Sequence, residues 1–500
     1  MHGHVWTLLW SICYFCVVLG LSLYGIHRYS ILYLYFKNRH RKPETPSNLD
    51  VLPIVTIQLP IYNEVHVVER LLKAISELDY PKDKFEIQVL DDSTDETRQL
   101  TDRTVANLQA DGFDAVVLHR KDRVGFKAGA LDYGFNRAKG EFFFILDADF
   151  VPPPNILRDC IHYFRDPKVG MIQTRWGHIN RSYSWLTRAQ AILLDGHLVL
   201  EQTARSRTGR FFNFNGTAGL WRKSCIGEAG GWQHDTLTED LDLSYRAQLR
   251  GWKFVFLGDI VTPAELPVDI DGLKTQQHRW AKGSIQTCKK VLPRLWRSKL
   301  PVFIKIEATA HLTANFAYLL LACLCVLQHP SSGPSSVAAG GVVRSMLIDF
   351  PIFIVTTVST TIFYLCAQRE LHPKTWKREI WFFPFVLALG IGLSINNGRA
   401  VLEAIFNRRS DFYRTPKYGI ERAKQEWKSR YSAVRTVIPL IEFLFAVYFT
   451  YFVFHAFQNR QFLSVPFLML FQIGFAYVAF GSMWQRVMRP PWHPRDISVA

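Results

Sequence analysis

Apolar and polar positions divide the chain into stretches of two unlike kinds. Residues 50–290 mix short apolar runs with polar positions, which is the pattern of a water-soluble domain. The other apolar residues gather in longer runs at 5–36, 308–328, 346–367, 381–395, 436–457 and 463–485. A helix needs ~20 apolar residues to cross the ~30 Å hydrocarbon core of a bilayer. We therefore expect one globular domain set between membrane segments.

Within the globular region, short apolar runs alternate with amphipathic stretches. Residues 69–78 and 93–107 have helical periodicity, and the runs that predict strands are 55–59, 86–90, 115–118 and 142–146. This alternation indicates βαβ units and a Rossmann-like, mixed but mostly parallel sheet of the α/β class. Ligands bind at the carboxyl ends of the strands in such sheets, so chemistry is expected in the residues that follow each strand.

The apolar stretch 381–395 is short and runs into Asn396, Asn397 and Arg399. If it spanned the membrane, the basic run 408–435 would lie outside, against the tendency of positive residues to stay in the cytoplasm. The sequence therefore favours five spanning helices, including the N-terminal one, with 381–395 in the interface. Six spanning helices are the alternative. The basic, proline-containing stretch 291–307 is predicted to lie along the membrane face.

The formal charge of +16 does not predict a nucleic-acid partner, because the basic residues cluster beside apolar segments, as at 37–42 and 408–435. Such clusters are typical of the cytoplasmic ends of membrane helices. The apolar run 5–36 follows no charged residue and precedes a basic cluster, which is the reverse of a cleaved secretory signal. We expect residues 1–36 to be a retained anchor with its N-terminus outside. The globular domain and the tail 486–500 are then cytoplasmic.

Acidic residues follow the first two predicted strands. Tyr62 and Glu64 come after the first, and Asp91 and Asp92 come directly after the second. Polar and acidic side chains at strand ends suit a nucleotide base and ribose. Each group could equally cap the helix that follows it, since Asp caps helix N-termini well.

Two carboxylates at alternate positions, Asp147 and Asp149, follow the buried run 142–146. They are hard oxygen ligands that can bridge Mg²⁺ or Mn²⁺ to a diphosphate, and without a cation they would repel each other. Lys127 lies in a glycine-flanked segment at a predicted loop-to-helix junction. That setting favours phosphate binding.

Two further groups point to an acceptor and a base. Gly216 and Thr217 belong to a small-residue loop that could let an acceptor sugar approach the backbone. Glu239 and Asp240 stand at the start of a helix predicted for residues 241–249. A helix N-terminus keeps a carboxylate ionised, although the pair could merely cap the helix. We favour a catalytic pair in which Asp240 is the general base.

The last group precedes the membrane half of the chain. Gln276 and Arg279 fall on one face of a helix, and Trp280 follows at once. A guanidinium can bind pyrophosphate with two hydrogen bonds, and an indole offers a flat face to a sugar ring. An ordinary Arg-Trp pair at a membrane boundary is the alternative.

The ordered set Asp91/Asp92, Asp147-Ala148-Asp149, Thr238-Glu239-Asp240 and Gln276-x-x-Arg279-Trp280 resembles a known signature. It is similar to the D, DxD, TED and QxxRW motifs of processive family 2 glycosyltransferases, the cellulose, chitin, hyaluronan and mannan synthases. Residues 126–130 and 214–219 look most like cellulose-synthase-like A and C proteins. The resemblance implies a GT-A domain above a transmembrane channel. It also implies inverting, metal-assisted transfer from GDP-mannose or UDP-glucose to a β-linked polymer, such as mannan, glucomannan or glucan, with β-1,4 linkage expected.

The same resemblance implies roles for individual residues. Asp240 would be the base, and Asp147 and Asp149 would hold the diphosphate and the Mg²⁺ or Mn²⁺ ion. Nucleotide-sugar contacts would come from Tyr62, Glu64, Asp91, Asp92, Lys127, Asp147, Gln276, Arg279 and Trp280, and acceptor contacts from Gly216, Thr217 and Trp280. Phe412, Thr415 and Lys417 resemble a cytosolic gating loop, expected near 407–435, although Arg414 replaces the family's valine.

The expected organisation is an α/β GT-A domain inserted into an α-helical membrane region. Its parts are the anchor 1–36, the domain 50–290, the interfacial segment 291–307, the channel region 308–485 and the tail 486–500. The expected location is a plasma, inner or Golgi membrane, with a nucleotide sugar, growing polysaccharide and lipid as partners. Oligomeric state is left open. The alternatives are a transferase that adds a single sugar to a lipid carrier, and a transporter or lipid-binding protein with an inactive transferase-like domain.

Overall fold

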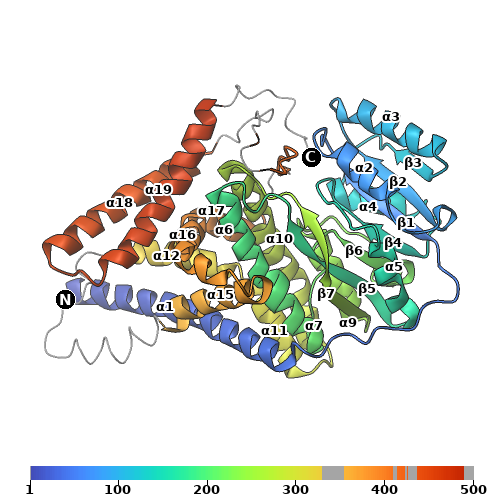
Figure 1. The fold of residues 1–500 in the computed structure, drawn as a ribbon. Helices are drawn as coiled ribbons and strands as arrows, with labels where there is room; N and C mark the ends of the chain where they lie inside the picture. The colour runs from blue at the N-terminus through green and yellow to red at the C-terminus, as the bar shows by residue number, and fades with distance from the viewer. Residues whose placement is uncertain (1, 329–353, 409–413, 423–424, 426–435, 489–500) are drawn as a thin grey trace.

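The computed structural model describes residues 2–328, 354–408, 414–422, 425 and 436–488, and Figure 1 shows how their elements are arranged. The sheet and its flanking helices form one side of the molecule. The long helices α1 (His2–Asn38), α18 (Ile438–Gln458) and α19 (Val465–Met488) form the other. The globular domain and the long apolar helices thus occupy separate regions, as the hydropathy pattern predicts.

Seven strands form one sheet in the order β3-β2-β1-β4-β6-β5-β7. Their bounds are β1 Val55–Ile61, β2 Phe85–Asp91, β3 Asp114–Leu118, β4 Phe142–Ile145, β5 Val169–His178, β6 Gly219–Arg222 and β7 Lys253–Ala264. β6 is antiparallel to both of its neighbours, and the other neighbouring pairs are parallel. The predicted mixed, mostly parallel sheet is therefore confirmed. The four predicted strands are β1 to β4, whereas β5 to β7 were not predicted.

Helix α2 of the domain buries one face, whereas α9 is buried nearly all round. In α2 (Val68–Ser76), the buried residues Val68, Leu71, Leu72 and Ile75 recur at the spacing of one helix face. The remaining helices of the domain are α3 Thr97–Ala110, α4 Phe126–Phe135, α5 Ile156–Ile161, α6 Trp185–Asp195, α7 Gln202–Arg207, α8 Lys223–Glu228 and α9 Glu239–Leu249. They are followed by α10 Ile270–Arg297, α11 Val302–Thr313, α12 Phe316–Leu327, α15 Ser359–Leu371, α16 Glu379–Gly392 and α17 Ser394–Ile405.

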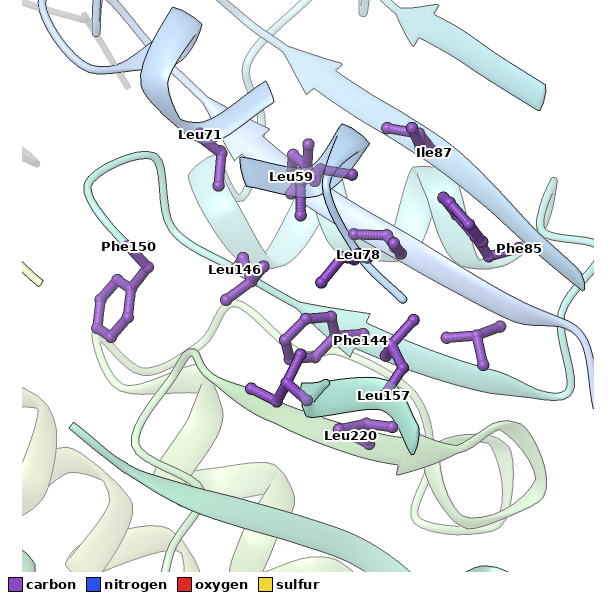
Figure 2. Packing of buried hydrophobic residues seen from close by; sticks show 14 of the residues in the cluster. Leu59, Leu71, Leu78, Phe85, Ile87, Phe144, Leu146, Phe150, Leu157 and Leu220 are labelled. Carbon is purple, nitrogen blue, oxygen red and sulfur yellow. The ribbon is translucent and has the colours of Figure 1, made fainter. Parts of the chain in front are cut away.

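The core lies on both faces of the sheet. Figure 2 shows Leu59, Phe144 and Leu146 packed with Leu157 and Leu220 on one face. A second cluster, which includes Phe143, packs against the other face. A strand buried on both faces reads as a continuous apolar run, which is why β4 was visible in the sequence. It also means that the polar residues just beyond β4 are held on a rigid support.

Within the described residues, four helical segments are long and apolar enough to cross a membrane. They are Leu8–Asn38, Trp376–Ile405, Ile438–Gln458 and Val465–Val487, and α11 with α12, which meet at a 55° bend, would make a fifth. The predicted runs at 5–36, 436–457 and 463–485 all fall on such helices. Part of the predicted run 346–367 lies outside the described residues, and its remainder leads into α15.

The helical segment around 381–395 is longer than its apolar run, so length alone does not exclude a span, and its place in the interface stays a prediction. Residues Trp376–Ile405, which include α16 and α17, are a 30-residue candidate span. The asparagines that seemed to end the apolar run are buried in protein contacts: Asn396 Nδ2 donates to the Lys274 carbonyl at 3.0 Å, and Asn397 is fully buried. The predicted interfacial segment 291–307 is divided between two helices, and its place along the membrane face stays a prediction. Its first part continues α10 and its last part starts α11.

Phe144→Ala should lower the free energy of unfolding by about 3–5 kcal/mol, because it leaves a cavity among fully buried neighbours. The measurement is the thermal unfolding midpoint of the detergent-solubilised protein. Val116→Ala, on the partly exposed strand β3, is the control and should cost under about 0.5 kcal/mol. Equal shifts in the two variants would contradict the packing described for β4.

Candidate active site

A pocket of about 220 Å³ opens where β1, β2 and β4 end, and α10 and residues 414–417 close it. Fourteen of the residues predicted to be functional line it: Tyr62, Glu64, Asp92, Lys127, Asp147, Asp149, Gly216, Glu239, Asp240, Gln276, Arg279, Trp280, Thr415 and Lys417. The structure thus brings together side chains that are spread over most of the sequence. Phe412 lies outside the described residues.

Asp147 and Asp149 leave the end of β4, and each is paired with a lysine from another element. Lys127 Nζ is 2.5 Å from Asp147 Oδ1, and Lys417 Nζ is 2.6 Å from Asp149 Oδ2. The Asp147 amide donates to Thr217 Oγ1 at 2.8 Å. The two neighbouring negative charges predicted here are therefore balanced by two ammonium groups. The hydroxyl of Thr217 fixes the backbone at Asp147.

Lys127 connects the two halves of the pocket. It stands in the first turn of α4 and also donates to the Gly216 carbonyl at 2.8 Å. Burial alone would lower the pKa of Lys127, but the carboxylates of Asp147 and Glu239 raise it above its ordinary value. The ammonium group of Lys127 therefore stays charged between the end of β4 and α9.

Glu239 and Asp240 begin α9, as predicted. Asp240 Oδ1 accepts a hydrogen bond from the Leu241 amide at 2.8 Å. Burial, and then the negative charge of Glu239, raise the pKa of Asp240 to about 7, while burial also raises the pKa of Glu239 against the opposing charge of Lys127. A carboxyl group with a pKa near neutrality is suited to accept a proton at physiological pH.

Helix α10 presents Gln276, Arg279 and Trp280 to the pocket. Arg279 Nη2 donates to Thr415 Oγ1 at 3.0 Å, which ties the helix to the closing segment. On the opposite side, His278 Nε2 is 3.2 Å from the carboxylate of Glu403 in α17.

The same Glu403 carboxylate also binds Lys282 of α10 at 3.1 Å, and Arg399 of its own helix at 2.8 Å. These contacts hold the His278 side of α10 against α17, so the side that carries Arg279 is turned toward the pocket.

The ends of β1 and β2 are occupied differently from the sequence expectation. The Arg123 guanidinium lies 3.3 Å from the ring centroid of Tyr62. Asp92 lines the pocket, but its carboxylate is already paired twice with Arg120, at 2.9 and 2.5 Å. Asp91 lies behind the wall and is 1% exposed, with Oδ1 accepting from the Ser93 amide. Asp91 and the buried Thr217 do not line the pocket in the structure, and their contacts with a ligand stay a prediction.

Residues 414–422 dock into the pocket from the membrane half of the chain. Arg414 Nη1 lies 3.2 Å from Glu64 Oε1, and burial raises the pKa of Glu64 to about 7 despite this partner. The backbone amides of Tyr418 and Gly419 donate to the Glu265 carboxylate at 3.0 Å each. This segment therefore seals one end of the pocket in the structure.

Sequence reasoning missed several pocket residues, notably Arg123, His178, Asn215 and Glu265. His178 ends β5 and Glu265 directly follows β7, and neither strand was predicted. The rule that chemistry follows a strand end would have found both residues once those strands were known. Asn215 belongs to the small-residue loop, where only the glycine and the threonine were considered.

The carboxylate oxygens of Asp147 and Asp149 are suitable ligands for a divalent cation. Both are oxygen donors at the pocket, and each already neutralises a positive group. Among the described residues, no cluster of three or more His, Cys, Asp or Glu side chains completes a metal site. An ion held here would take its other ligands from a bound diphosphate or from water.

Comparison with known proteins agrees with this arrangement. Residues 53–283 match the family described as "Glycosyltransferase like family 2". Glucomannan 4-beta-mannosyltransferase 2 of Arabidopsis thaliana is 42% identical over 258 residues, which cover 51% of this chain and 48% of that protein. Glucomannan 4-beta-mannosyltransferase 1 of Cyamopsis tetragonoloba is 37% identical over 341 residues, which cover 62% and 64%. The chain thus spans about half the length of the relatives it matches.

A solved structure shares the fold. The mannosyltransferase PcManGT from Pyrobaculum calidifontis, in complex with GDP-Man and Mn²⁺, superposes with a TM-score of 0.55 at 19% identity. The match covers 79% of this chain and 99% of that chain. The GT-A-like fold expected from the sequence is confirmed. The family expectation is supported as well, because residues 53–283 match the model of a glycosyltransferase family 2 domain.

Proposed function

We propose that the chain is a membrane-embedded, processive, inverting glycosyltransferase that extends a β-1,4-linked polysaccharide and passes it through the membrane region. The observation that carries the proposal is the pocket, where the Asp147/Asp149 pair, the Asp240 base and the QxxRW residues of α10 meet. Such a set supplies the parts that sugar transfer needs. They are charge for a diphosphate, a base for a hydroxyl and a flat surface for a sugar.

In this mechanism, Asp240 takes the proton of the acceptor's terminal hydroxyl, and the oxygen attacks the anomeric carbon of an α-linked donor. The nucleoside diphosphate leaves, so inversion gives a β linkage. Lys127 and Arg279 hold the diphosphate by charge, and Trp280 supports the acceptor sugar. When Mg²⁺ or Mn²⁺ is bound by Asp147 and Asp149, it supplies further positive charge to the leaving group.

We assign GDP-mannose as the first donor to test, with UDP-glucose second. The relatives at 36–43% identity are all named glucomannan 4-beta-mannosyltransferases, which supports mannosyl transfer and a 4-linked product. The candidate spans support a membrane location, and the basic clusters beside them support a cytoplasmic catalytic domain. Helix α10 leads from the pocket into α11, which is a suitable start for a product path.

Purified protein in detergent should make polymer from labelled GDP-mannose with Mn²⁺ or Mg²⁺, and β-mannanase should digest that polymer. Asp240→Asn should abolish synthesis and keep nucleotide binding, because the amide cannot accept the proton. Asp149→Ala should weaken both. Single-sugar lipid products would favour the non-processive transferase instead. A protein whose cellular function is unchanged by Asp149→Ala would support the transporter alternative.

The rate of transfer should rise with pH through about 7 and level off above it. The reason is that Asp240 must be ionised to act as base, and burial with Glu239 raises its pKa from 3.8 to about 7. The measurement is kcat/KM against pH from about 5.5 to 9. The pKa of Glu64 is also raised to about 7, so Glu64→Gln is the matched control, and its kcat/KM should still rise with pH through about 7. If this rise disappeared in Glu64→Gln, it would be due to Glu64, which would contradict the role of Asp240.

Gly216→Ala should reduce transfer at least about tenfold, since the new Cβ would lie 3.0 Å from Asp240 Oδ2. Gly216 has φ +82°, so the variant also carries backbone strain of about 1–2 kcal/mol. Gly112→Ala is the matched control, because Gly112 has φ +84° and no atom within 4 Å of its added Cβ. Both variants should lose similar thermal stability, and only Gly216→Ala should lose activity. Full activity in Gly216→Ala would show that space beside the Asp240 carboxylate does not limit transfer.

A further inference from the structure

A small cluster of amide side chains lies behind the pocket wall at the loop that follows α7. Asn215 Oδ1 accepts hydrogen bonds from Asn213 Nδ2 at 3.0 Å and from Gln202 Nε2 at 2.8 Å. Its backbone amide donates to Gln173 Oε1 at 2.8 Å. His197 Nε2 stands 3.3 Å from the same Asn215 oxygen. The carbonyl end of the Asn215 side chain is therefore turned into the protein.

The orientation of this amide follows from backbone partners whose roles are fixed. Gln202 Nε2 also donates to the Asn213 carbonyl at 3.1 Å, and Asn213 Nδ2 also donates to the Phe214 carbonyl at 2.9 Å. A carbonyl oxygen can only accept, so both of these side chains must present their NH₂ groups here. Turning the Asn215 amide over would then set donor against donor twice. Its oxygen must face the cluster and its NH₂ group must face the other way.

The amide nitrogen of Asn215, which points away from the cluster, has no partner among the described residues. Asn215 lines the pocket, and its Nδ2 is shielded from bulk solvent and has no hydrogen-bond partner in the described part of the chain. A buried donor left unpaired costs about 1–3 kcal/mol, so such a group is expected to meet a ligand or water. At the next residue, Gly216, an added Cβ would lie 3.0 Å from Asp240 Oδ2. The unpaired donor therefore belongs to the residue next to the one that adjoins Asp240.

A chain of buried charges holds the cluster in place from behind. His197 Nδ1 is 2.9 Å from Glu201 Oε2, and Arg205 Nη1 is 3.0 Å from the same oxygen. Arg205 is 1% exposed and also binds Glu307 of α11 at 3.0 Å, which His27 of α1 contacts at 3.1 Å. The amide cluster is therefore braced against two helices of the membrane half. A polar group held this rigidly can select among the closely similar hydroxyls of a sugar.

We propose that Asn215 is a specificity-determining residue. Its Nδ2–H donates a hydrogen bond to an oxygen of the acceptor's terminal sugar, next to the hydroxyl that Asp240 deprotonates, and so fixes which hydroxyl reacts. This inference rests on the proposed function and adds the recognition of the acceptor to it. It assigns no contact with the donor nucleotide, since the phosphate-facing cations belong to other elements.

The test compares Asn215→Asp with the wild type, using GDP-mannose and a β-1,4-linked mannose tetrasaccharide as acceptor. Aspartate keeps the size of the side chain and one buried oxygen, and it replaces the donor with an acceptor. We expect the KM for the tetrasaccharide to rise about tenfold or more, with a smaller change in kcat and a lower fraction of 4-linked product. GDP affinity and hydrolysis of GDP-mannose without acceptor should stay within about twofold, which also shows that the variant is folded.

A second variant tests the orientation argument. Gln202→Glu removes the NH₂ group that holds Asn215 Oδ1. Like Asn215→Asp, it should raise the KM for the tetrasaccharide and lower the fraction of 4-linked product. Asn136→Asp, at the exposed end of α4, is the matched control and should change nothing.

The assignment is overturned if Asn215→Asp keeps the wild-type KM and linkage, or if GDP affinity and donor hydrolysis fall in parallel with transfer. A wild-type protein that transfers to no acceptor would instead overturn the proposed function and this assignment with it.

Discussion

Charge balance inside a buried pocket is the constraint on which the rest of this structure depends. Four carboxylates that the sequence places in two motifs, Asp147, Asp149, Glu239 and Asp240, converge in a space of about 220 Å³. Buried carboxylates so close together would take up protons or repel each other without cations. The cations come from elements that are distant in sequence, chiefly α4, α10 and residues 414–422. Each ion pair therefore also fastens one element of the fold to another.

This constraint joins the catalytic domain to the membrane half. Lys417 and Arg414 reach the pocket from beyond α17. Glu403 of α17 holds α10 from the other side through His278 and Lys282. Removing one partner of a buried pair costs about 3–5 kcal/mol, because the remaining charge is left uncompensated. The helix that carries Arg279 is thus fixed by contacts on both of its faces. Membrane helices and catalytic groups are parts of one electrostatic arrangement.

The sequence predicted the parts of the site that depend on local pattern. The strand β4 was visible as a continuous apolar run, and the acidic motifs followed from the residues after strands and before α9. What it missed depends on pairing between distant segments. β5 and β7 pair with each other across some eighty residues, so Glu265 could not be located without that pairing. Likewise, the ion pair of Asp92 with Arg120 could not be read from the sequence. The hydrogen bond of Asn396 to the Lys274 carbonyl, which lets a polar residue lie inside the helical segment, could not be read from it either.

Lys127 illustrates why the motifs need one another. In the sequence, its glycine-flanked segment alone indicated no more than a setting that favours phosphate binding. In the structure it bridges Asp147 and the Gly216 carbonyl, and its charge opposes the rise in pKa that burial imposes on Glu239 and Asp240. Two adjacent buried carboxyl groups without that cation would both favour their protonated forms, and neither could act as a base at neutral pH. If a diphosphate binds at the same lysine, as the proposed mechanism requires, its binding changes the proton affinity of Glu239 and Asp240.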